Sequence, residues 1–93
     1  MRATEAVFKD AESKLAGVGF DPASIIMIIS ILISLFKLCK SWKPKNGLGP
    51  LELRRLRRRL KKHGIKGAEK IETLFAESKL EDLNAFVKAC RRI

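Results

Sequence analysis

The chain has 93 residues, with 20 Lys or Arg against 10 Asp or Glu, so its formal net charge is +10 at pH 7. A chain of this length forms one domain with a limited hydrophobic core, which a partner or a membrane can complete. Two cysteines and one histidine make neither a disulfide scaffold nor a metal-type spacing, and no Gly-rich phosphate loop or nucleophile–base pairing is present. The composition therefore predicts a protein without enzymatic activity, cofactor or metal.

Residues 1–20 predict an amphipathic helix followed by a hinge. One side of a helix over residues 4–16 carries four apolar residues, which are Val7, Phe8, Ala11 and Leu15. Gly17 ends this helix, and a second glycine follows two residues later. The first 22 residues mix acidic and basic side chains, so we expect no cleavable secretory signal.

Residues 21–42 predict a strongly apolar helix. Asp21 is suited to cap its N-terminus, and Pro22 fits the first turn, where no backbone N–H is needed. The uncharged run over residues 22–36 has 15 residues and spans roughly 22 Å, against about 30 Å for the hydrocarbon core of a bilayer. Lysines near the end of the segment can extend to a headgroup layer, where Trp42 also fits. The segment is therefore a candidate membrane span, and the alternative is a buried core helix of a soluble assembly.

One narrow stripe of this helix is small or polar, and we call it the small-residue stripe. Successive residues lie about 100° apart around a helix. That spacing brings six residues to one side, namely Ala23, Met27, Ser30, Ser34, Lys37 and Ser41. Such a stripe permits close helix–helix packing in lipid, and in a ring of copies it can line a pore.

The positive charge is concentrated in residues 37–62, which hold eleven basic residues against the single acidic Glu52. Residues 43–49 within this stretch contain Pro and two Gly and predict a basic linker. If residues 21–42 span a membrane, the charge asymmetry places the basic stretch on the cytoplasmic side, or on the genome-facing side of an enveloped particle. The protein is then membrane-associated.

Residues 50–93 predict a basic three-helix unit, which makes the expected fold all-α. Pro50 opens its first helix, and the His63-Gly64 pair ends it. A short helix is expected over residues 68–77. Ser78 then begins a capping-box pattern that starts the last helix.

The first helix of this unit joins a narrow apolar seam to a broad cationic surface. Leu53, Leu56 and Leu60 form the seam. The predicted binding residues are its basic side chains and two from the linker: Arg54, Arg55, Arg57, Arg58, Arg59, Lys61, Lys62, Lys43 and Lys45. Arginine forks bind phosphate bidentately, and released counterions favour binding without reading a base sequence. The nucleic-acid backbone is the expected partner, and anionic lipid, an acidic protein surface and simple solvation are the alternatives.

In organisation, the apolar run over residues 21–43 followed by the Arg-rich run over residues 54–62 resembles small virion proteins of bacteriophages. These are minor membrane proteins or internal ejection proteins. The resemblance implies a multi-copy structural protein that tethers a membrane or an apolar protein shell to nucleic acid. Two other functions remain open from the residues alone: a soluble oligomeric nucleic-acid-binding module, and a pore-forming membrane protein that uses the small-residue stripe.

Overall fold

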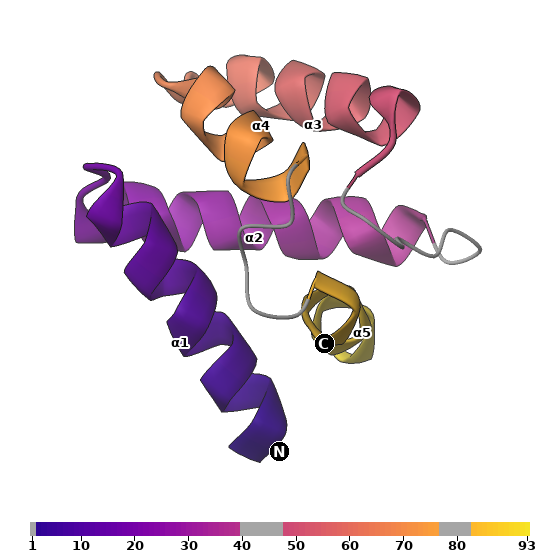
Figure 1. The fold of residues 1–93 in the computed structure, drawn as a ribbon. Helices are drawn as coiled ribbons and strands as arrows, with labels where there is room; N and C mark the ends of the chain where they lie inside the picture. Colours follow the sequence, from indigo (N-terminus) through magenta and orange to yellow (C-terminus); the bar gives the residue numbers. More distant parts are fainter. Residues whose placement is uncertain (1, 40–47, 77–82) are drawn as a thin grey trace.

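The computed structural model describes residues 2–39, 48–76 and 83–93, and these ranges contain helices and no strand. The helices are α1 Arg2–Gly17, α2 Pro22–Leu38, α3 Pro50–Lys62, α4 Ala68–Ala76 and α5 Leu83–Arg92 (Figure 1). The prediction of an all-α fold is confirmed.

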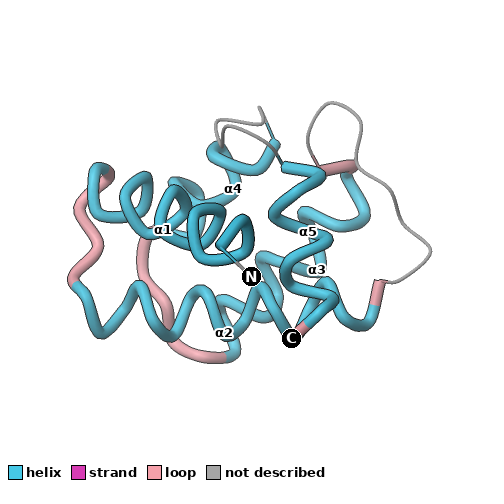
Figure 2. Tube along the Cα trace, turned by 90° about the horizontal axis from the view of Figure 1, so that it is seen from below, coloured by secondary structure: helices cyan, strands magenta, loops and turns pink. Residues whose placement is uncertain are grey.

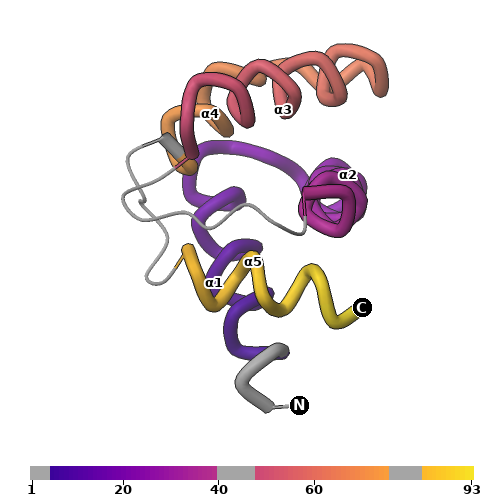
Figure 3. Tube along the Cα trace, turned by 90° about the vertical axis from the view of Figure 1, so that its right-hand side faces the viewer, coloured from indigo at the N-terminus to yellow at the C-terminus, as the bar shows by residue number. Residues whose placement is uncertain are grey.

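The apolar helix α2 lies along one side of the molecule, where three other helices pack against its inner face (Figure 3). It packs against α1, α3 and α5, while α3 also packs against α4 and α1 against α5. Figure 3 views α2 almost along its axis and shows α3 on one side of it and α5 on the other. From below, α1 and α5 lie side by side (Figure 2). Helices from both halves of the chain therefore cover α2.

Side chains of the other helices cover the buried face of α2. Its buried residues are Ile25, Ile28, Ile31, Leu32, Leu35 and Phe36. The prediction of a membrane-spanning helix over residues 21–42 finds no support, because no helix among the described residues combines the length and apolarity needed to cross a bilayer. The predicted continuation to Trp42 is also wrong, since α2 ends at Leu38. Residues 40–42 lie outside the described ranges.

Side-chain capping from α5 accounts for this early end of α2. Cys39 leaves the helical conformation, with φ −99° and ψ 51°. Arg91 of α5 donates from Nε to the Phe36 carbonyl, at 3.3 Å, and from Nη2 to the Cys39 carbonyl. Carbonyl groups in the last turn of a helix lack intrahelical partners, and a cation is also favoured there by the helix dipole. Arg91 thus satisfies carbonyls that a longer helix would have used itself.

Four aromatic rings from four helices meet in the core. The ring of Phe86 in α5 lies 5.6 Å from that of Phe8 in α1, 6.1 Å from that of Phe36 in α2 and 5.6 Å from that of Phe75 in α4. The first two pairs are edge-to-face, which is a favoured arrangement for aromatic rings. Phe86 is the residue that joins this cluster, because it contacts the other three rings.

The C-terminal end of α3 is determined by the residues next to it in the sequence. Gly64 has φ +71°, a conformation that glycine adopts without strain. The N–H of Ile65 donates to the Leu60 carbonyl at 3.0 Å, as in the backbone turn expected after a C-terminal glycine. This end of the helix is confirmed. The residue Ser78, proposed to cap the last helix, lies outside the described ranges.

The C-terminal helices do not pack only with one another. α3 pairs with α4, but α5 packs against α1 and α2. The division of the chain at residues 20, 42 and 49 stays a prediction. The core itself combines residues from 1–39 with residues from 48–93.

Asp21 caps α2 as its sequence position predicts. Its Oδ2 accepts from the Ser24 N–H at 3.4 Å, and its Oδ1 accepts from the Ser24 hydroxyl at 2.6 Å. These hydrogen bonds, with the Ser24 hydroxyl contributing most, lower the pKa of the Asp21 carboxyl from its usual 3.8. They favour the ionised carboxylate, and they form only in the folded chain.

We expect Asp21→Ala to lower the melting temperature at pH 7 and to lose this effect in acid. A carboxyl whose pKa is lower in the folded state stabilises the fold above its unfolded pKa, and that stabilisation disappears as the pH falls through the folded pKa. Thermal melts of both proteins, followed by circular dichroism between pH 7 and pH 2, would measure the difference. A difference in melting temperature that stayed constant down to pH 2 would contradict the capping role of the carboxylate.

Candidate nucleic-acid interface

The helix α3 lies on the outside of the molecule with its apolar seam turned inward. Leu56 and Leu60 are 0% exposed, and Leu53 is half-buried against the same core. The basic side chains occupy the rest of the helix surface: Arg54, Arg55, Arg57, Arg58, Lys61 and Lys62 are exposed, and Arg59 is half-buried. The predicted division of α3 into a packing side and a charged side is therefore present in the fold.

Arg57 is paired within the protein. Its Nη2 lies 2.9 Å from Oε1 of Glu72 in α4, and its Nε lies 3.0 Å and 3.1 Å from the two carboxylate oxygens. This fork-shaped contact links α3 to α4 and compensates the charge of Arg57. Of the predicted binding residues, Arg57 is thus engaged in holding two helices together.

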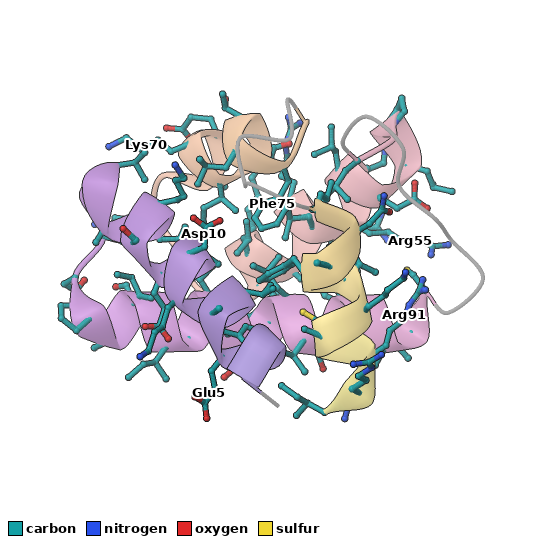
Figure 4. All side chains as sticks on the ribbon, turned by 60° about the horizontal axis from the view of Figure 1, so that its bottom comes forward. Glu5, Asp10, Arg55, Lys70, Phe75 and Arg91 are labelled. Carbon is teal, nitrogen blue, oxygen red and sulfur yellow. The ribbon has the colours of Figure 1, made fainter. Side chains whose placement is uncertain are left out.

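Arg55 reaches from α3 to the C-terminal end of α2. Its Nη1 lies 3.6 Å from Sγ of the buried Cys39. Arg91 approaches the same end of α2 from α5, and Figure 4 shows both arginines on this side of the molecule. A thiol is a weak acceptor, so this contact orients Arg55 without compensating its charge.

Five further basic side chains of α3 make no hydrogen bond or ion pair with another residue of the described ranges. They are Arg54, Arg58, Arg59, Lys61 and Lys62, and we call them the cationic face. Arg54, Arg58 and Lys62 follow one another at a spacing of four. Each like-charge pair at this spacing costs about 0.2–0.5 kcal/mol in an isolated helix. The cationic face is thus a surface where an approaching polyanion relieves repulsion.

Side chains of α2 and α3 form a pocket where the end of α2 meets α3. It has a volume of about 290 Å³ and is lined by Leu35, Leu38, Cys39, Arg55, Arg58 and Arg59. We call it the arginine pocket. This pocket was not predicted from the sequence, although the spacing of Arg55, Arg58 and Arg59 places them on neighbouring turns of one helix. Nothing in that spacing tells which helix would lie opposite.

The small-residue stripe of α2 faces away from the core. Ala23, Met27, Ser30 and Ser34 are exposed, and Lys37 is half-buried. Ile26, on the same outer side, is 70% exposed. Ser41 lies outside the described ranges, as do the predicted binding residues Lys43 and Lys45. The proposed roles of the stripe in helix packing or in a pore stay predictions.

The next question is whether the described residues could bind a metal ion or provide a reactive thiol. They contain no group of three or more His, Cys, Asp or Glu residues that could hold a metal ion. Cys39 and Cys90 are both buried free thiols. Burial raises the pKa of the Cys90 thiol to about 12, so this thiol stays protonated at neutral pH.

Comparisons with protein-family models, with curated proteins and with solved structures gave no match for this chain.

Proposed function

We propose that the protein binds the phosphate backbone of nucleic acid, without reading its sequence, through the cationic face of α3. The observation that carries this proposal is the row of five basic side chains on one helix that lack a partner among the described residues. In this proposal α2 serves as the centre of the core. It corresponds to the sequence-based alternative in which the apolar helix is covered by protein.

The shape and chemistry of α3 suit a phosphate backbone. A helix of 13 residues is roughly 20 Å long, and double-stranded DNA carries one charge per about 1.7 Å of its axis. Several phosphates therefore lie within reach of one side of α3. The helix contains no aromatic residue on which a base could stack, which favours contact with the backbone over base recognition.

The burial of the apolar seam favours nucleic acid over a lipid surface. A helix that lies in a membrane interface inserts its apolar face between the lipids. In α3 that face belongs to the core, because Leu56 and Leu60 are 0% exposed. The helix can therefore offer lipid its charge, but not the buried leucines that would anchor it.

We expect the triple variant Arg54→Gln, Arg58→Gln and Arg59→Gln to weaken binding equally for DNA duplexes of different sequence. Each phosphate contact contributes about 0.9 to the slope of log affinity against log salt concentration, so the slope should flatten by up to about 2.7. Fluorescence anisotropy with labelled duplexes at several salt concentrations would measure both quantities.

A matched variant removes the same charge from helices other than α3. Lys9 and Lys14 of α1 and Lys88 of α5 are exposed, and their replacement by Gln should leave the salt slope close to that of the unmodified protein. If the variant of α3 kept the full slope, or if both triple variants lost the same amount, the cationic face would not be the binding surface.

A further inference from the structure

Three arginines of α3 line the arginine pocket, which is partly open to solvent. Arg55 and Arg59 lie one turn apart on α3, and Arg58 lies between them in sequence. The other three lining residues are Leu35, Leu38 and Cys39, so no carboxylate of the described residues lines the pocket. Arg58 and Arg59 have no side-chain partner among the described residues. The pocket therefore carries positive charge that its own walls do not compensate.

The end of α2 reduces this charge only in part. The C-terminus of a helix is equivalent to roughly half a negative charge. Arg91 already binds two of the carbonyls there, at Phe36 and Cys39. Three arginines thus line one pocket whose other described walls supply far less than one opposing charge. An anion of high charge and small size fits this environment.

We propose that the arginine pocket binds a phosphate monoester, namely the terminal phosphate of a nucleic-acid strand. This inference rests on the proposed function and adds strand-end recognition to it. A phosphate monoester carries about −1.5 to −2 at pH 7 and offers three acceptor oxygens, whereas a phosphodiester inside a strand carries one charge. Three arginines offer one donor group for each of the three monoester oxygens, and the higher charge of the monoester neutralises more of their positive charge than a phosphodiester can.

The size of the pocket agrees with a phosphate and the adjoining part of one sugar. Its volume of about 290 Å³ lies just below the roughly 300–1,000 Å³ typical of small-molecule sites. Leu38, at the rim, is 70% exposed and offers an apolar surface to whatever the phosphate is attached to. The remainder of the strand can then follow the cationic face along α3.

The test compares oligonucleotides of one sequence that end in a 5′-phosphate or in a 5′-hydroxyl. We expect the full-length protein to bind the phosphorylated form about tenfold more tightly, which corresponds to one additional charge-assisted hydrogen bond. The preference should shrink below about pH 6, where the phosphate dianion takes up one proton and becomes a monoanion. Equal affinity for the two oligonucleotides at pH 7.5 would overturn the inference, while a preserved salt dependence would leave the proposed function standing.

Two single variants of the same helix separate the pocket from the rest of α3. Arg58→Gln removes a pocket residue, and Arg54→Gln removes the same charge from an exposed position outside the pocket. We expect Arg58→Gln to abolish the preference for the 5′-phosphate. Arg54→Gln should lower the affinity for both oligonucleotides by the same factor and keep the preference. Equal behaviour of the two variants would overturn the assignment to the pocket.

Alkylation of Cys39 provides a second measurement that does not depend on strand binding. Cys39 lines the pocket and is 6% exposed, whereas Cys90 is 0% exposed and serves as an internal control. Inorganic phosphate and the phosphorylated oligonucleotide should slow the modification of Cys39 by a small maleimide, and Arg58→Gln should remove this protection. Unchanged modification rates would overturn the inference. The inference would also be overturned if the protein bound vesicles containing phosphatidic acid, but not vesicles containing phosphatidylglycerol, and showed no preference between the two oligonucleotides.

Discussion

Leu32→Lys is expected to unfold the protein, whereas Ser34→Lys, on the same helix, is expected to leave it folded. Leu32 is 0% exposed in the middle of α2, and Ser34 is exposed. A lysine at Leu32 would place a charge without a partner among apolar side chains, at a cost of several kcal/mol. The total stability of a small domain is about 5–15 kcal/mol, so this cost consumes much or all of it. Circular dichroism and thermal melts of both variants would measure the outcome.

The comparison of these two variants tests whether the other helices cover one face of α2. In the fold described here only one face of the helix needs shelter from water, so the two positions should differ sharply. A helix surrounded by lipid or by other copies on every face would be disrupted at both positions. Similar losses of stability in the two variants, or a stable Leu32→Lys protein, would contradict the arrangement of α1, α3 and α5 around α2.

Phe86→Ala is expected to lower the free energy of unfolding by about 3–5 kcal/mol, as is typical of phenylalanine truncation in a core. The variant leaves a cavity and removes the ring that contacts Phe8, Phe36 and Phe75. The four rings come from four helices, so the empty space cannot be filled by the movement of one helix alone. Urea unfolding should show a lower midpoint with an unchanged dependence on urea concentration.

An exposed apolar residue supplies the control for this variant. Leu51 is 54% exposed at the start of α3, and Leu51→Ala should change the free energy of unfolding by less than about 0.5 kcal/mol. A loss of under about 1 kcal/mol for Phe86→Ala would mean that the aromatic cluster does not hold the four helices together.

Helix positions were predictable wherever the signal is local. Asp21 and Pro22 mark the start of α2, and Gly64 with Ile65 marks the end of α3, because capping depends on residues within a few positions of the helix terminus. The end of α2 was not predictable in this way. Arg91 acts on Phe36 and Cys39 from the far end of the sequence, and no pattern near residue 39 announces it.

The environment of the apolar helix was undecided for a physical reason. Lipid and a protein core both exclude water, so an uncharged run of 15 residues satisfies either. The decisive information is the apolar surface of the other helices, such as Phe86 and Val87 of α5, which packs against α2. The sequence shows that these residues are apolar, but it does not show which helix they pack against.

The charge of the candidate interface was predictable, and its internal partners were not. The density of arginine in residues 54–59 follows directly from the sequence. The pairing of Arg57 with Glu72 and the contact of Arg55 with Cys39 depend on how α4 and α2 pack against α3. Tertiary packing therefore gives similar residues of one run different surroundings. Arg57 is paired with Glu72, Arg55 lines the arginine pocket, and Arg54 is exposed.

The ring contact between Phe8 and Phe86 joins two residues separated by almost the whole chain. Such distant contacts are slow to form, because closing the long loop between the two residues costs entropy before the contact can offset it. During synthesis, the part of α2 that packs against α5 stays uncovered until α5 has left the ribosome. The nascent chain thus exposes an apolar surface that includes Phe36, and a chaperone that binds such surfaces can act before residues 83–92 dock.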